Sequence, residues 1–186
     1  MTTAGARRLP AGPAAIGVLA VGAAVAVALG VYGNVHDPTG RSLVTLFFTA
    51  TINLKVWFAT IAVSLALFQL VSALRIYRKI GSGPAPRWLA VAHRFSGTAA
   101  FLFSIPVAYH CLWALGFQTH STRVLAHSLL GCAFYGALAA KVLVVRSRSL
   151  PGWLLPVAGG TLFTVLVGVW LTSAFWFFTT VEFPGF

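Results

Sequence analysis

Long apolar runs separated by short polar turns dominate the chain and predict five membrane-spanning helices. The predicted spans lie at about 14–31, 52–74, 88–115, 123–145 and 154–178. Each run is long enough to cross the hydrocarbon core of a bilayer, which takes an α-helix about 20 residues. Because helices satisfy their backbone hydrogen bonds internally, as lipid requires, the predicted fold is all-α, a polytopic transmembrane helical bundle.

Three features modify this simple pattern. Residues 42–51 are apolar and continue into the second run, so we expect a short interfacial helix before that span. Pro106 lies inside the third run and predicts a kink, since proline removes a helical hydrogen bond. Arg7 and Arg8 precede the first run, so this run is either a membrane anchor or a cleaved signal peptide. We expect residues 1–13 to form a cytoplasmic tail and residues 14–186 to form one transmembrane domain.

Composition supports a membrane protein and the charge pattern predicts its orientation. The chain is 59% hydrophobic and 8% charged, whereas soluble domains are about 25% charged. Its net charge of +11 does not indicate nucleic-acid binding, because the basic residues lie beside the spans, where they set topology and contact anionic lipid. The predicted cytoplasmic side carries most of them, namely Arg7, Arg8, Arg75, Arg78, Lys79, Arg87, Arg146 and Arg148. We therefore expect a multi-pass protein of the cell (plasma) membrane with its N-terminus inside.

The candidate chemistry lies in residues 88–131, which contain four of the five histidines. The midpoint between His110 and His127 falls between Gln118 and Thr119, in the middle of the polar turn at 116–122. In an antiparallel hairpin, this symmetry puts both imidazoles at one depth. Reflection through the other turns adds Lys55 and Ser173 to the same layer, near the outer face. Polar side chains inside a membrane are costly and mark candidate functional sites.

Two imidazoles at one depth predict a bis-histidine haem b, with His110 and His127 as the metal ligands. Gly131 follows His127 by one helical turn and leaves room for the porphyrin edge. Lys55 and Arg123 are near enough in depth to pair with the propionates. The alternative is that the two histidines form a hydrogen-bonded contact between helices, as polar membrane residues do.

A second polar group lies at the inner end of the third span. His93, Arg94 and Ser96, together with Lys141 or Gln69, are candidates for a quinone pocket. The alternative is that His93 and Arg94 extend to the lipid headgroups. We assign no catalytic residue, because Asp37 and Glu182 are the only carboxylates and cannot form a catalytic pair. His36 and His120 lie in outer turns, and the different depths of Cys111 and Cys132 predict free thiols.

Three stretches carry a family resemblance: LKVWFAT followed by FQLVSALRIY, then AHRFSGTAAFLFSIPVAYHCLWALGF, then RVLAHSLLGCAFYGALAAKVLVVR. From Leu43 onward the chain resembles an uncharacterised family of actinobacterial integral membrane proteins, which implies a fold but no activity. HRFSG and HSLLG are similar to segments of b-type cytochrome membrane subunits, including the cytochrome b561 and ferric-reductase-like group and the succinate dehydrogenase anchor. The HRxSG segment of that anchor lies near quinone. The b561 group uses four histidines for two haems, whereas this chain offers one matched pair.

The expected function is electron transfer by a membrane b-type cytochrome-like protein with one bis-histidine haem near the outer face. It would pass single electrons between quinol or a membrane redox partner and an extracytoplasmic acceptor. One alternative is a cofactor-free structural or assembly subunit of a membrane complex. A small transporter is less consistent with the sequence, which shows no inverted repeat and few intramembrane charges.

Overall fold

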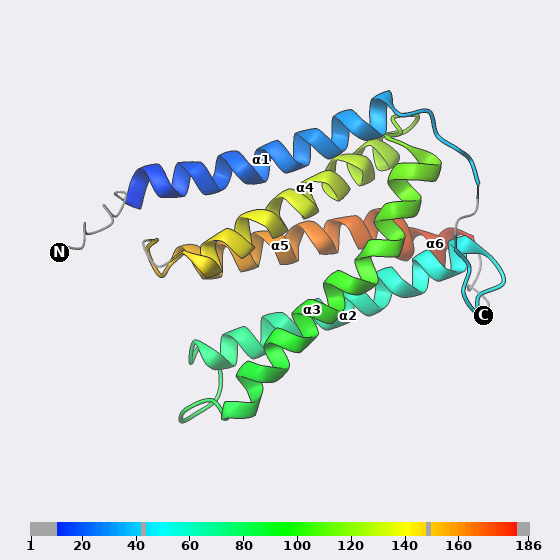
Figure 1. Cartoon of the computed structure of the whole chain (residues 1–186). Coiled ribbons are helices and arrows are strands. Elements are labelled where there is room, and N and C mark those ends of the chain that lie inside the picture. The colour runs from blue at the N-terminus through cyan, green and yellow to red at the C-terminus, as the bar shows by residue number, and fades with distance from the viewer. Residues whose placement is uncertain (1–10, 42–43, 148–149, 182–186) are drawn as a thin grey trace, which may run out of the picture.

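The computed structural model describes residues 11–41, 44–147 and 150–181, and helices make up most of these residues. The α-helices are α1 (Ala11–Val35), α2 (Thr51–Ile76), α3 (Arg87–His110), α4 (Thr122–Arg146), α5 (Leu154–Trp170) and α6 (Trp176–Thr180) (Figure 1). Two π-helical turns, η1 (Cys111–Leu115) and η2 (Leu171–Phe175), extend α3 and join α5 to α6. No strand occurs among the described residues, which confirms the all-α prediction.

Five continuous helical stretches are long and apolar enough to cross a membrane. They comprise residues 12–35, 51–76, 87–115, 122–146 and 154–180. Each coincides with one predicted span, so the chain is a multi-pass membrane protein with the predicted number of spans. Large apolar side chains such as Ile16, Leu102 and Leu129 are more than half exposed along the helices. Such exposure is what a lipid-facing surface requires.

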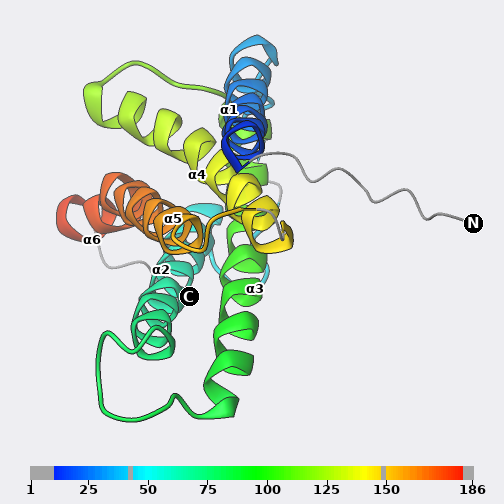
Figure 2. The ribbon, with the colours of Figure 1, turned by 90° about the vertical axis from the view of Figure 1, so that its left-hand side faces the viewer.

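The helices do not pack in the order in which they follow one another. α4 packs between α1 and α5, α5 also packs on α2, and α2 packs along α3. Figures 1 and 2 show α1, α4 and α5 on one side and the α2–α3 pair diverging from them toward the α2–α3 loop. Although α3 and α4 are consecutive, they do not pack along each other. The two predicted histidine ligands therefore lie on helices that are separated.

The core is small and aromatic. Phe48, Leu54 and Phe58 form one buried cluster, and Phe103 of α3 packs against it. A second cluster contains Ala66, Phe134 and Leu166, which join α2, α4 and α5. A hydrogen bond from Trp170 Nε1 to Thr60 Oγ1, 3.1 Å long, also ties α5 to α2. These contacts hold the two groups of helices together in the middle of the bundle.

One local prediction was wrong. Residues 44–50 form turns and bends, not the expected interfacial helix. Leu46 has a φ of 49°, which is incompatible with a right-handed helix, and Phe48 folds into the core with 6% of its surface exposed. Helix α1 begins at Ala11, within residues 1–13, which we expect to form a cytoplasmic tail. Residues 1–10 of that predicted tail lie outside the described residues.

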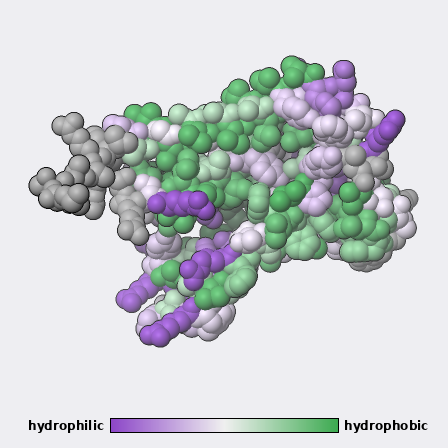
Figure 3. Space-filling view, in the orientation of Figure 1, coloured by the Kyte–Doolittle hydropathy of each residue, from purple (hydrophilic) through white to green (hydrophobic). Residues whose placement is uncertain are grey.

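The surface follows the same division between lipid-facing and water-facing parts. Figure 3 shows hydrophobic residues over most of the visible face of the helices. Hydrophilic residues gather toward the ends of the bundle, where the loops lie. This distribution is typical of a bundle that exposes its length to lipid and its ends to water.

Candidate functional site

His110 is the last residue of α3, and the π-helical turn η1 follows it directly. Its Nδ1 is buried and has no hydrogen-bond partner, and no other buried side-chain nitrogen or oxygen of the described residues shares this state. Such an unpaired buried group is rare in proteins and requires an explanation. π-helical turns frequently occur at functional sites. His110 therefore has the features expected of a residue whose partner is a ligand.

His127 lies in the second turn of α4 and contacts the junction of α5 and η2. Its Nδ1 lies 3.3 Å from Thr172 Oγ1. The Thr172 hydroxyl donates its proton to the carbonyl oxygens of Gly168 and Val169, at 2.8 and 3.0 Å. Because the hydroxyl has no second proton, it accepts from Nδ1–H of His127. This assignment of the tautomer leaves Nε2 unprotonated, which is the form that binds a metal ion.

Lys55, near the start of α2, is close enough for its charge to act on both His110 and His127. The structure thus brings these three predicted residues into one region. Asp37 is the only described acidic residue and lies exposed in the α1–α2 loop. No carboxylate of the described helices offsets the lysine, so this region favours an anionic ligand.

Arg123 also belongs to this region, but its guanidinium group already interacts with other residues of the chain. Its Nη1 donates a 2.7 Å hydrogen bond to the Thr172 carbonyl. Its guanidinium carbon lies 3.7 Å from the centre of the Trp176 ring, a cation–π contact. Sequence reasoning missed Thr172 and selected the adjacent Ser173, whose hydroxyl instead donates to Val169 O at 2.7 Å.

Gly131 lies one helical turn after His127 on α4 and adjoins open space. A methyl group added at Gly131 would meet no atom within 4 Å. Deeper in the bundle, the Tyr135 hydroxyl donates to the Ser104 carbonyl at 3.0 Å and so connects α4 to α3. This bond lies roughly 9–12 Å along the helix axes from the two histidines, at 1.5 Å per residue. Two imidazoles and nearby cations make up the donor set that a b-type haem requires.

The inner polar group is a hydrogen-bonded network between α2 and α3. Ser72 Oγ lies 2.7 Å from His93 Nδ1. Gln69 Nε2 donates to the His93 carbonyl and, at 2.7 Å, to Ser96 Oγ. The charge of Lys141 on α4 reaches His93, whereas Arg94 is exposed. The structure therefore joins two of the three predicted quinone-pocket residues, leaves Arg94 outside the network, and adds Ser72, which sequence reasoning missed.

The other candidate residues lie at the end of the bundle that carries the α1–α2 loop and the α3–α4 turn. His120 is exposed in the α3–α4 turn. His36 Nε2 lies 3.2 Å from the Trp113 carbonyl, and its ring stacks on Tyr32 with a centroid distance of 5.1 Å. Among the described residues, no three His, Cys, Asp or Glu side chains are grouped as a metal ion would require. Both cysteines are free, as predicted.

Comparison with known proteins supplies a family but no activity. No curated protein and no solved structure matches the chain. A family model matches residues 15–185, which include four of the spans in full and the first span from residue 15 onward. The chain therefore belongs to the family of unknown function DUF6529.

Proposed function

We propose that this chain is an electron-transfer protein of the cell membrane that binds one b-type haem through His110 and His127. The proposal rests above all on the unpaired, buried Nδ1 of His110. A ring nitrogen buried without a partner is destabilising by roughly 1–3 kcal/mol, so the position of His110 indicates a role other than helix packing, and Nε2 is the ring nitrogen that would bind the iron. His127, which lies in the same electropositive region, supplies the second imidazole.

The surrounding residues have separate roles in this proposal. Thr172 orients the His127 ring through Nδ1 and keeps Nε2 available. Lys55 supplies positive charge opposite the propionates, and Arg123 adds further N–H donors from its fixed position on Thr172. Gly131 leaves room beside the ligand. A bound haem supplies one-electron redox chemistry. The protein provides the ligands of the haem, buries it and places charged residues near it.

The proposal includes an electron donor and an acceptor. The donor is quinol at the inner network, beside His93, Arg94 and Ser96, or a redox partner protein in the membrane. The acceptor lies on the outer side, near the histidine layer. Polar groups concentrated at the inner end of α2 and α3, including Gln69 and the nearby Lys141, support a polar ligand there.

A second candidate function is a cofactor-free structural or assembly subunit of a membrane complex. The bond between His127 and Thr172 and the Arg123–Thr172–Trp176 contacts favour it, because they tie α4 to η2 and α6 without any ligand. In that case, His127 stabilises helix packing and His110 contacts a partner.

Histidine variants distinguish the two functions. His110→Ala and His127→Ala should each abolish haem binding while the protein still inserts and purifies as one species. His120→Ala, which removes an exposed histidine from the adjacent turn, is the matched control and should retain haem. If the first two variants keep the full haem content of the parent protein, the assigned ligands are wrong.

A further inference from the structure

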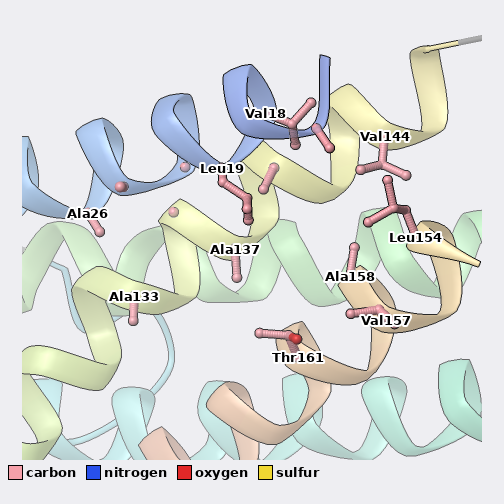
Figure 4. Close-up of a pocket in the computed structure, with 15 residues that line it drawn as sticks. Val18, Leu19, Ala26, Ala133, Ala137, Val144, Leu154, Val157, Ala158 and Thr161 are labelled. Carbon is pink, nitrogen blue, oxygen red and sulfur yellow. The ribbon is translucent and has the colours of Figure 1, made fainter. Parts of the chain in front are cut away.

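A groove runs along the lipid-facing side of the bundle between α1 and α5, with α4 as its floor (Figure 4). It exists because α1 and α5 both pack on α4 but do not pack on each other. Its floor is made of small residues, among them Gly136, Ala137 and Ala140. Of the fifteen lining residues, only Thr161 carries a polar side chain. The groove therefore suits a hydrocarbon occupant.

The length of the groove identifies the kind of occupant. On α4 its lining runs from Ala133 to Val144, and on α1 from Ala15 to Ala26. Each stretch is about 16 Å long at 1.5 Å per residue. The hydrocarbon core of a bilayer is about 30 Å thick, so the groove covers about one leaflet. A spanning partner helix would need contact along the whole core, whereas the acyl chain of a lipid occupies one leaflet.

A basic residue follows the end of the groove on α4. Val144 and Leu154 line this end, and Arg146, the last residue of α4, lies exposed two residues beyond Val144. No acidic residue occurs near this end among the described residues, since Asp37 belongs to the α1–α2 loop at the other end of α1. A basic residue at the headgroup level attracts anionic lipid.

We propose that this groove holds one acyl chain of an anionic phospholipid, whose phosphate lies beside Arg146. The lipid belongs to the leaflet on the side of the α4–α5 turn, which the charge pattern predicts to be cytoplasmic. It fills the gap between α1 and α5 and so completes the packing of the first helix. This site is independent of the histidine layer, and haem binding is not required for it.

Adjacent alanines on α1 provide a matched test. Ala23 lines the groove and Ala24 does not. Native mass spectrometry of protein purified in mild detergent should show one retained anionic phospholipid. Ala23→Phe, which fills the groove, should lower this retention roughly tenfold, the effect of losing about two buried methylenes. Ala24→Phe should leave it unchanged.

Two more variants make the test complete. Ala158→Phe fills the groove from α5 and should repeat the loss even if Ala23→Phe does not fold. Arg146→Gln should keep a bound lipid but remove the preference for an anionic headgroup over a zwitterionic one. Equal retention by Ala23→Phe, Ala158→Phe and Ala24→Phe would overturn the proposal. The proposal would also be overturned if the parent protein retained no lipid and formed a dimer that Ala23→Phe dissociates. The groove would then hold a second copy of the chain.

Discussion

Gly22 and Gly136 bring the backbones of α1 and α4 into direct contact. A methyl group added at Gly136 would lie 2.5 Å from the Gly22 carbonyl oxygen, and one added at Gly22 would lie 2.9 Å from the Gly136 carbonyl oxygen. Real carbon–oxygen contacts are not this short, so neither position accepts a side chain unless the helices move apart. Small residues at such crossings allow close packing in membranes, where lipid removes the hydrophobic drive for helices to associate.

Replacing Gly136 should therefore separate α1 from α4. Gly136→Ala is expected to lower the free energy of unfolding by about 1–3 kcal/mol, the usual cost of overpacking. Thermal or denaturant unfolding in detergent measures this effect. Gly160→Ala is the control, because a methyl group there meets no atom within 4 Å. It should be neutral or stabilising by up to about 1 kcal/mol, since alanine is the better helix former. Equal destabilisation by both variants would refute the close contact.

The Tyr135–Ser104 bond should contribute to the connection between α3 and α4. Tyr135→Phe removes its donor and leaves the buried Ser104 carbonyl without this partner, so we expect a loss of about 1 kcal/mol of unfolding free energy. Tyr109→Phe is the matched control, because Tyr109 is 50% exposed. The Tyr135 hydroxyl also lies 3.0 Å from Ser104 Oγ, so adding Ser104→Ala to Tyr135→Phe should cost less than the sum of the single changes. Full additivity would show that the two side chains do not interact.

The inner network should stabilise α2 against α3 through Gln69. Gln69→Leu removes its donors to the His93 carbonyl and to Ser96. We expect this variant to unfold about 1 kcal/mol more easily, as for other interhelical hydrogen bonds in membranes. Arg94→Gln, which changes the exposed neighbour outside the network, should stay within about 0.5 kcal/mol of the parent protein. A larger effect of Arg94→Gln than of Gln69→Leu would contradict this arrangement.

The orientation in the membrane follows from charge alone and can be tested by labelling. With Cys111 and Cys132 replaced by alanine, Thr39→Cys reports on the α1–α2 loop and Ser82→Cys on the α2–α3 loop. An impermeant maleimide should label Thr39→Cys in intact cells and Ser82→Cys only after permeabilisation, since basic loops stay in the cytoplasm. The reverse pattern would show that the N-terminus is outside.

Apolar run length was enough to predict the spans, because the thickness of the bilayer fixes the length of a spanning helix. It did not predict the fold of residues 44–50. There Leu46 adopts a positive φ, and Phe48 packs on Phe58, which in turn packs on Phe103 of α3, a residue distant in sequence. A tertiary contact of this kind has no signature in the local sequence. An apolar segment has the same sequence pattern whether it lies on lipid or folds into a core.

Counting residues from the turns predicted the depth of each side chain in the membrane, but not the face of the helix from which it projects. This method placed Lys55, His110 and His127 at one level, and the structure brings the charge of Lys55 within reach of both histidines. It selected Ser173, whereas His127 meets Thr172 on the adjacent position of the same turn. Residues one apart point about 100° away from each other on a helix. Counting residues could not predict the separation of α3 from α4 either, since it depends on the packing of α1 and α5 against α4.

Haem binding is tested most directly by a dithionite-reduced minus oxidised visible spectrum of the detergent-purified protein, together with a pyridine haemochrome assay. We predict a sharp α band of b type and about one haem per chain, as expected for a single bis-histidine site. The absence of a Soret band, even after expression with added haem, would contradict the proposed cytochrome function. The polar contacts of His127 would then be interpreted as helix packing, and His110 as a contact for a protein partner.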